Sequence, residues 1–285
     1  MSCRLVQIES TPLASLECFG RGVWFGTALR LVIYRSSLLG LESWMGDLIP
    51  KGVLSLVGGG EWQSELAQFD KELLEIADSD EVVVLPTAAA YEIPERAVSN
   101  AQSHFSKLGA LVKGVMVLNR RDAMNKRFAD EIAEARFIYL SGGSPLHLRS
   151  VLKDSLVYGA MLYAYRRGAV LAGSSAGGMV LTDPMADPRG GAFTMGLGLI
   201  SPLAFVPHFE SYPAERKDRT LKLATRGVAI LGVAEGSSVI RLPDGTMSER
   251  GKHGASAYID GKPCTIEEIA SKVEVDPSKS SLYVS

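Results

Sequence analysis

The sequence contains few cysteines, and the three it has do not form a recognisable group. Cys3, Cys18 and Cys264 are widely spaced, and no two of them form a Cys-x-x-Cys pair. An odd and scattered set of this kind excludes a disulfide framework and lacks the spacing of a zinc site. We therefore expect a protein of a reducing compartment, the cytoplasm, that uses neither a metal nor an organic cofactor.

The sequence also has little net charge and no dense basic run. Lys and Arg number 30 and Asp and Glu number 32, which gives a formal net charge of -2. Nucleic acids and anionic membranes attract clusters of positive charge, so neither is expected as a partner. The content of 46% hydrophobic and 22% charged residues is typical of a globular protein with a sizeable core.

No apolar run is long enough to cross a membrane. The most apolar stretch near the N-terminus, Phe19 to Leu41, is interrupted by three arginines, whereas a spanning helix takes about 20 apolar residues. Acidic residues precede this stretch, which disfavours a secretory signal. We expect residues 1–48 to be an extension outside the core fold, with Met45 as an alternative start of translation. An amphipathic segment that binds a membrane or a partner is the less favoured alternative.

From Val53 onward, short β-branched runs alternate with stretches of helical period. The predicted strands are nearly continuous apolar runs, as expected for strands that are buried on both faces of a parallel sheet. They cover Val53–Val57, Val82–Leu85, Val112–Leu118, Phe137–Leu140 and Val170–Ala172. The predicted helices between them cover Pro94–Leu108, Ala123–Ala135 and Val157–Arg167. The alternation predicts an α/β fold with a mostly parallel sheet flanked by helices.

Near the C-terminus the pattern changes to that of hairpins. Pro243-Asp244-Gly245 is a strong turn sequence, and Asp260-Gly261 forms another after the short strand Ala257–Ile259. We expect a small antiparallel element there. Because no repeat and no linker marks a second domain, residues 49–275 are expected to form a single α/β domain and residues 276–285 a frayed tail.

The strongest candidate for chemistry lies where a predicted strand runs into a turn of small residues. The run Gly173-Ser174-Ser175-Ala176-Gly177 follows the strand Val170–Ala172 and precedes a predicted helix. This is the context of the Gly-x-Ser-x-Gly elbow, and only Ser175 has glycine both two positions before it and two positions after it. We predict that Ser175 is the nucleophile of a serine hydrolase and that the Ala176 N–H stabilises an oxyanion. A turn without chemistry, or a phosphate cradle, is the alternative.

A second oxyanion donor is expected at the end of a neighbouring strand. Ser141-Gly142-Gly143-Ser144-Pro145 follows the predicted strand Phe137–Leu140, and we choose the Gly143 N–H as that donor. The glycines can also serve as a tight turn, with Ser144 as N-cap and Pro145 as the first helical residue. The two interpretations are compatible.

A serine nucleophile needs a base, and the sequence offers four histidines. His104, His147 and His253 lie in predicted helices or in a polar hairpin, where surface or capping roles explain them. His208 instead closes the apolar run Leu203–Pro207, at a position typical of the carboxyl end of a strand, where active sites of open α/β sheets gather. We predict His208 as the general base, with a core histidine bonded to a carbonyl group as the alternative.

The third group should be a carboxylate that orients the histidine. Asp183 and Asp187 are near Ser175 in sequence, but each precedes a proline and is typical of a turn. Glu235 follows the apolar run Ile230–Ala234, where an acid would be costly to bury without a partner. Spacing alone leaves Glu235 and Asp187 both open. If Glu235 is the acid, the order nucleophile, histidine, acid differs from that of the α/β-hydrolases and argues against an ordinary esterase.

Seven short runs from across the sequence form a set of landmarks. In chain order they are Gly59-Gly60, Leu85-Pro86-Thr87-Ala88, Tyr139-Leu140-Ser141-Gly142-Gly143, Gly173-Ser174-Ser175-Ala176-Gly177-Gly178, Gly196-Leu197-Gly198-Leu199, Pro207-His208-Phe209 and Gly232-Val233-Ala234-Glu235-Gly236. Together they resemble the dipeptidase E and cyanophycinase family of serine peptidases, over about residues 53–260. The resemblance implies a flavodoxin-like sheet akin to that of class I glutamine amidotransferases. It also implies a Ser-His-Glu triad, which here is Ser175, His208 and Glu235.

The residues after His208 leave the substrate open. Cyanophycinases carry regularly spaced arginines there and commonly a glutamine before the histidine, whereas this chain has Pro207 and basic residues interspersed with acids. Arg216 and Arg219 are candidates for binding a substrate carboxylate, and a solvated helix face is the alternative. We expect a dipeptidase E-like serine exopeptidase acting on small peptides. A cyanophycinase-like exopeptidase acting on an aspartate-rich polymer, and a non-catalytic ligand-binding protein of amidotransferase-like fold, are the alternatives, and a homodimer is left open.

Overall fold

The computed structural model describes residues 52–189 and 192–278. The expected extension, residues 1–48 with Met45, lies outside the described residues, and so do residues 279–285 of the expected tail. Of that tail, residues 276–278 are described, and the Asp276 N–H donates to the Leu199 carbonyl oxygen at 2.8 Å. Within the described ranges, no helix combines the length and the apolar character needed to span a membrane.

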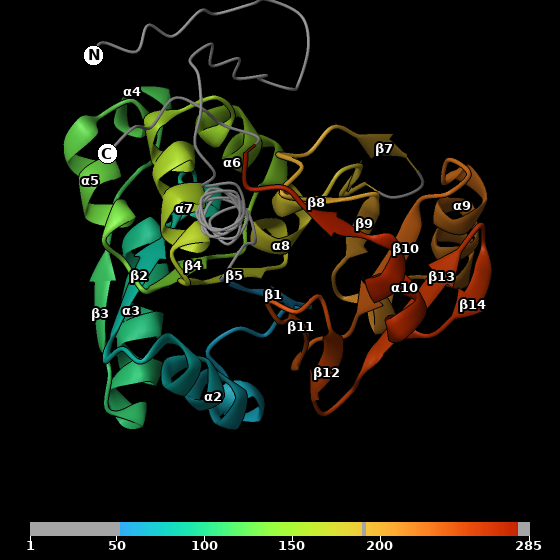
Figure 1. The fold of residues 1–285 in the computed structure, drawn as a ribbon, viewed down its shortest axis with the longest axis horizontal. Helices are drawn as coiled ribbons and strands as arrows, with labels where there is room; N and C mark the ends of the chain where they lie inside the picture. Colours follow the sequence, from blue (N-terminus) through green and yellow to red (C-terminus); the bar gives the residue numbers. More distant parts are fainter. Residues whose placement is uncertain (1–51, 190–191, 279–285) are drawn as a thin grey trace, which may run out of the picture. The chain divides into compact units, whose positions relative to one another are not determined.

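A seven-stranded sheet forms the centre of the fold (Figure 1). Five of its strands are parallel: β1 (Val53–Val57), β2 (Glu81–Leu85), β3 (Leu111–Gly114), β4 (Phe137–Leu140) and β5 (Val170–Ser174). Two antiparallel strands extend it beyond β1: β11 (Ser237–Arg241) and β12 (Met247–Gly251). The strand order is β12-β11-β1-β5-β4-β2-β3. The predicted α/β fold with a mostly parallel sheet is confirmed, and the predicted turn Pro243-Asp244-Gly245 joins its antiparallel strands.

Helices cover both faces of this sheet (Figure 1). One face carries α2 (Ala67–Ala77) and α3 (Pro94–Phe105). The other face carries α5 (Lys126–Ala133), α6 (Pro145–Leu152), α7 (Leu156–Arg166) and α8 (Ala176–Leu181). Strand side chains alternate between the two cores: Leu54 and Leu56 belong to one, Val53 and Val57 to the other. The inner strands β1, β2, β4 and β5 are therefore largely buried on both sides, which explains their nearly continuous apolar runs. The edge strand β3 is partly exposed.

The predicted strand at Val112–Leu118 is shorter than expected. It pairs only with β2, and the Val115 N–H makes the last bond between them, to the Val84 carbonyl oxygen at 2.9 Å. Because β3 is the edge strand and β2 itself ends at Leu85, the residues after Val115 have no neighbouring strand to pair with.

The range predicted for the helix Ala123–Ala135 is also wrong, because the structure has two helices in this part of the chain. A short helix, α4 (Arg120–Ala123), ends before Asn125, and α5 begins after it. The Asn125 side chain accepts a hydrogen bond from the Arg127 N–H at 3.0 Å. Asparagine is among the best N-cap residues, so it starts a new helix at a point where the apolar period alone predicts a continuous one.

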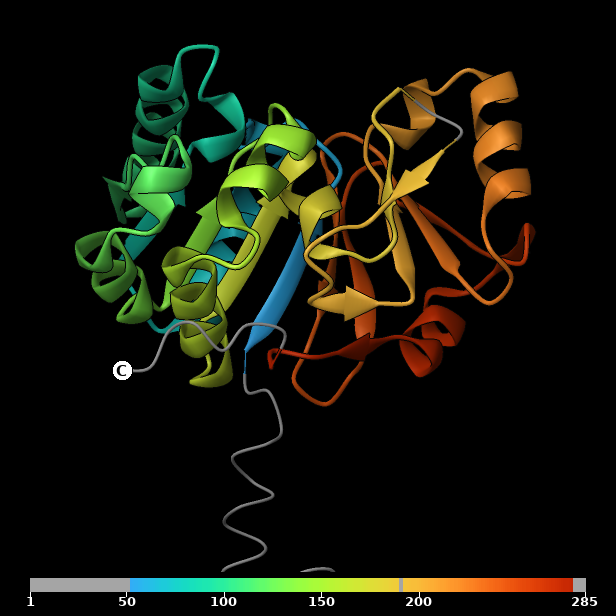
Figure 2. The same cartoon turned by 90° about the horizontal axis from the view of Figure 1, so that it is seen from above.

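A second sheet of four strands holds much of the C-terminal part of the chain (Figure 2). Its strands are β9 (Leu203–Val206), β10 (Ala229–Val233), β13 (Ala255–Ile259) and β14 (Lys262–Cys264), in the order β14-β13-β10-β9. Other elements in this part are α9 (Ala214–Leu223), α10 (Ile266–Lys272), and the paired short strands β6 (Met185–Ala186) with β7 (Phe193–Thr194) and β8 (Ile200–Ser201) with β15 (Glu274–Val275). The hairpin at Asp260-Gly261 is confirmed, but this separate sheet is not predicted by the sequence pattern. β9 and β10 are apolar runs of the same kind as the inner strands of the central sheet, and tertiary pairing decides which sheet each strand joins.

His104 differs from its expected surface position on a helix. The residue is buried, and its Nε2 lies 2.8 Å from Oδ2 of Asp70, which is fully buried on α2. Burial raises the pKa of the Asp70 carboxyl above its usual value, although the His104 side chain works in the opposite direction. The pair links α2 and α3 beneath the sheet, so His104 has a structural role.

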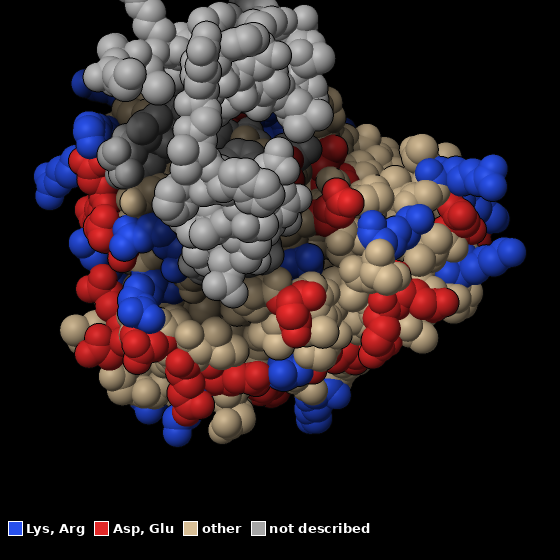
Figure 3. All heavy atoms as spheres, in the orientation of Figure 1, with Lys and Arg blue, Asp and Glu red and all other residues tan. Residues whose placement is uncertain are grey.

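Some charged surface residues pair within their own helices. Lys126 lies 2.6 Å from Asp130, and Lys222 lies 2.6 Å from Asp218, each four residues apart. Such exposed pairs contribute about 0.3–0.5 kcal/mol each. On the face shown in Figure 3, acidic and basic side chains are interspersed over the described residues.

Candidate active site

Ser175 lies in the sharp turn between β5 and α8, at the carboxyl end of the central sheet. Its backbone has φ 47° and ψ -108°, a conformation that residues other than glycine adopt at a cost of about 1–3 kcal/mol. The Ser175 N–H donates to the Val57 carbonyl oxygen of β1 at 2.9 Å. The strained turn lifts the half-buried serine side chain out of the strand, as in a nucleophile elbow.

The glycines on either side of this turn are required by close backbone contacts. A Cβ atom at Gly173 would lie 2.5 Å from the carbonyl carbon of Gly177. A Cβ atom at Gly177 would in turn collide with the carbonyl oxygen of Leu140 on β4. The sequence motif therefore reflects packing of the helix directly on two strands.

His208 follows β9 and reaches the serine from the second sheet. The Ser175 Oγ and His208 Nε2 atoms are 2.9 Å apart, within hydrogen-bond distance. Glu235 follows β10, and its Oε1 lies 2.5 Å from His208 Nδ1. With Nδ1–H donating to the carboxylate, Nε2 is left to accept the serine proton. The Glu235 side chain is 54% exposed, so this arrangement borders on solvent.

Asp187, the other acid left open by spacing, lies elsewhere. Its carboxylate accepts hydrogen bonds from Arg189 Nε at 2.9 Å and Arg189 Nη2 at 2.7 Å. These bonds, with one from the Arg189 N–H, hold the pKa of Asp187 below its usual value. The structure thus brings Glu235, and not Asp187, to His208.

The loop after β1 holds His208 directly and Glu235 through its neighbour Gly236. The Gly58 carbonyl oxygen accepts from the His208 N–H at 2.8 Å, and the Gly59 carbonyl oxygen accepts from the Gly236 N–H at 3.0 Å. The His208 ring packs directly on Gly59, where a Cβ atom would lie 2.6 Å from Nδ1. The consecutive carbonyl groups of Val57, Gly58 and Gly59 thus bond the backbone of Ser175, of His208 and of the residue after Glu235. The Gly59-Gly60 run in the sequence marks this loop.

The two candidate oxyanion donors lie at the ends of neighbouring strands. Ala176 is the first residue of α8, so its N–H has no acceptor within the helix. The Gly143 N–H has no hydrogen-bond partner within residues 52–189 and 192–278, whereas the preceding Gly142 N–H donates to Oε1 of Glu61 at 3.1 Å. The predicted cap is present as well, because the Ser144 side chain accepts from the His147 N–H and α6 begins at Pro145.

A pocket of about 350 Å³ opens beside Ser175 and His208. Charges of both signs line it, because Glu61, Glu92 and Arg96 are among its walls. The sequence pattern singles out none of these three side chains. Arg96 and Glu92 lie on or next to an ordinary amphipathic helix, and only the fold brings them to the pocket.

Arg216 and Arg219, the predicted contacts of a substrate carboxylate, lie on α9. The Arg216 guanidinium lies over the Tyr212 ring, 5.2 Å from its centroid. Arg219 Nη2 is 3.3 Å from Oε1 of Glu215. Neither arginine lines the pocket beside Ser175.

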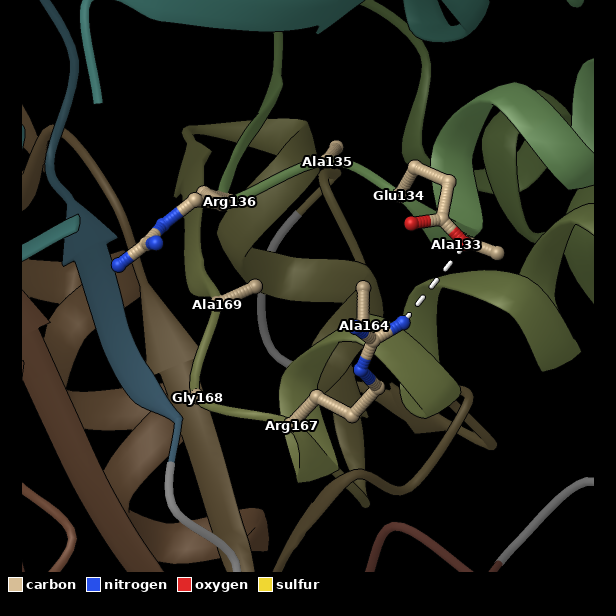
Figure 4. A pocket seen from close by; sticks show the side chains of 8 residues that line it. All are labelled: Ala133, Glu134, Ala135, Arg136, Ala164, Arg167, Gly168 and Ala169. Atoms are coloured by element: carbon tan, nitrogen blue, oxygen red, sulfur yellow. Dashed lines mark ion pairs between the residues drawn. The ribbon is translucent and has the colours of Figure 1, made fainter. Parts of the chain in front are cut away.

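A second hollow lies at the opposite end of the central sheet, before β4 and β5 (Figure 4). Its charged side chains already have partners: Arg167 Nη1 is 3.7 Å from Oε1 of Glu134, and Arg136 Nε donates to the Ala77 carbonyl oxygen at 2.7 Å. Since the amino ends of the parallel strands are far from the serine turn, this hollow is separate from the candidate site.

Comparisons with known proteins agree with this geometry. The sequence model of peptidase family S51 matches residues 54–249. The crystal structure of a peptidase from an acI-B1 actinobacterium has 26% sequence identity and a TM-score of 0.66, covering 76% of this chain and 98% of that one. A putative peptidase E protein from Listeria monocytogenes EGD-e has the same fold at 16% identity and a TM-score of 0.54, covering 70% of this chain and 98% of that one. A search of curated proteins gave no match.

Proposed function

The chain belongs to peptidase family S51 and is a serine peptidase, and on this premise we propose that it acts as a dipeptidase E-like exopeptidase on short peptides. The observation that carries the proposal is the hydrogen-bonded series from Ser175 through His208 to Glu235. A hydroxyl, an imidazole and a carboxylate in this order make a serine nucleophilic on many unrelated folds.

In the proposed mechanism His208 Nε2 takes the proton from Ser175 Oγ as the oxygen attacks the peptide carbonyl carbon. The N–H groups of Ala176 and Gly143 hold the resulting oxyanion. The protonated imidazole, stabilised by Glu235, then gives its proton to the leaving amine, and the C–N bond breaks. A water molecule, deprotonated by His208, attacks the acyl-enzyme and releases the acid product.

The pocket supports a small substrate. Its volume of about 350 Å³ lies at the low end of the range of roughly 300–1,000 Å³ that is common for ligand sites. A free dipeptide carries an ammonium group and a carboxylate, and the pocket offers Glu92 to the first and Arg96 to the second. A polymer or a folded protein does not present an ammonium group and a carboxylate at this short separation.

Free dipeptides are therefore expected to be the best substrates. We expect blocking of the amino end by acetylation to lower kcat/KM by at least about tenfold, because the ammonium group loses a carboxylate partner. The measurement is a cleavage screen over dipeptides, their acetylated forms, short acyl esters and an aspartate-rich polymer, with Ser175→Ala protein as the blank. Faster cleavage of the polymer or the esters would contradict the proposal, and a folded protein that cleaves none of them would favour a ligand-binding role.

Gly59→Ala is expected to lower kcat by about 10²-fold, because small displacements of a catalytic group are costly. Gly59 has φ +129°, and its added methyl group would push the His208 ring away from Ser175. The control is Gly109→Ala, where φ is +84° and no atom lies within 4 Å of the added carbon. That control should lose about 1–2 kcal/mol of stability and keep its activity. Equal activity of the two variants would show that the ring does not depend on Gly59.

A further inference from the structure

One carboxylate outside the Ser-His-Glu series ties two parts of the site together. Glu61, in the loop after β1, accepts a hydrogen bond on Oε2 from Ser174 Oγ at 2.7 Å. Its Oε1 accepts from the Gly142 N–H at 3.1 Å. Glu61 therefore bridges the turn after β5, which carries Ser175, and the loop after β4, which carries Gly143.

We propose that Glu61 is a positioning residue of the peptidase reaction, an inference that rests on the proposed function. By holding the Gly142 N–H, it fixes the orientation of that peptide group and leaves the next N–H, that of Gly143, available to the oxyanion. By holding the Ser174 hydroxyl, it stabilises the residue next to the strained Ser175. A strained backbone persists only where its surroundings determine it several times over.

The bridge is shielded from water and its loop is anchored. Ser174 is fully buried and Glu61 is half-buried, so water competes little for the Ser174 hydroxyl group. The carbonyl groups of Gly58 and Gly59 anchor the loop that carries Glu61. A Cβ atom at Gly142 would lie 3.0 Å from the Glu61 oxygen, so the two are in close contact.

The contacts of Glu61 distinguish positioning from proton transfer. Among the hydrogen bonds of the described residues, none joins Glu61 to Ser175 or to His208. A glutamine could make the same bridge, because its carbonyl oxygen can accept from the Gly142 N–H and its amide can donate to the Ser174 hydroxyl, which also accepts. The bridge thus needs the shape of the side chain more than its charge.

The test compares Glu61→Ala with Glu61→Gln on dipeptide hydrolysis. We expect Glu61→Ala to lower kcat by about 10²-fold with KM changed less than about threefold, since a lost oxyanion donor typically costs 10²–10³-fold in kcat. We expect Glu61→Gln to stay within about fivefold of wild type. Glu75→Ala, the same substitution at an exposed position on α2, serves as the matched control and should leave kcat unchanged.

A second readout does not depend on turnover. Hydrogen exchange of the Gly142 amide is expected to be faster in Glu61→Ala and unchanged in Glu61→Gln, because only the first variant lacks the acceptor. If Glu61→Ala does not fold, Ser174→Ala removes one of the two bonds and is expected to lower kcat by about tenfold, a loss of about 1.4 kcal/mol.

Two results would overturn the inference. The first is a wild-type kcat together with unchanged Gly142 exchange in the alanine variants. The second is a Glu61→Gln variant as slow as Glu61→Ala, which would assign the role to the negative charge. Failure of the proposed function would give a different experimental result. In that case wild-type protein shows no cleavage that depends on Ser175, while the Gly142 exchange still reports whether Glu61 fixes the loop.

Discussion

Replacing Ser175 by alanine is expected to lower kcat for dipeptide hydrolysis by about 10⁶-fold, as expected for loss of the nucleophile of a serine peptidase. The variant keeps the pocket and the N–H groups of Ala176 and Gly143, so a residual rate above that of water should remain. Its fold should be unchanged, because only the Oγ atom, bonded to His208, is removed. The measurement is kcat at saturating dipeptide, with circular dichroism to check folding.

The matched control is the same substitution one residue earlier. Ser174→Ala also removes a hydroxyl group from the turn, but that hydroxyl contacts Glu61 and not His208. It should therefore lose only about tenfold. A Ser175→Ala variant that keeps a tenth or more of wild-type activity, or a Ser174→Ala variant that is the slower of the two, would move the nucleophile away from Ser175.

Glu235→Gln is expected to lower kcat by about 10²- to 10³-fold. The amide keeps the size of the side chain but loses the negative charge that stabilises the imidazolium of His208. Removal of the corresponding charge from a buried triad costs about 10⁴-fold. We expect less here because the Glu235 side chain is 54% exposed, and water screens a charge at such a position.

Asp187→Asn is the control for this prediction, because spacing in the sequence leaves both acids open. Asp187 pairs with Arg189 and, within the described residues, makes no hydrogen bond with His208, so the exchange should leave kcat within about twofold of wild type. The opposite pattern, with Asp187→Asn slow and Glu235→Gln active, would exclude Glu235 as the partner of His208.

Much of the fold could be predicted because burial on both faces leaves a direct trace in the sequence. Strands such as Phe137–Leu140 are apolar throughout and are bounded by turn residues. The elbow is visible for a similar reason, since close packing admits only glycine at Gly173 and Gly177. Buried strands and close-packed turns can therefore be predicted, because each is imposed by a constraint within a short stretch of sequence.

Features that depend on tertiary contacts were not predictable. The helix position of His104 gives no sign of its burial, because its partner Asp70 belongs to a different helix. Glu61 is one acid among many in the sequence, and its two partners lie 81 and 113 residues further along the chain. These contacts leave no periodic or motif-like signal in the sequence, so only the structure reveals them.

The most direct test of the central claim is to locate the residue that reacts with a fluorophosphonate, a reagent that modifies activated serines. Wild-type protein would be treated, digested and sequenced by mass spectrometry. We predict a single adduct on Ser175, its loss in Ser175→Ala, and slower labelling in Glu235→Gln, since the hydroxyl group reacts only when His208 removes its proton. An adduct on another serine, or folded protein that remains unlabelled, would contradict the account.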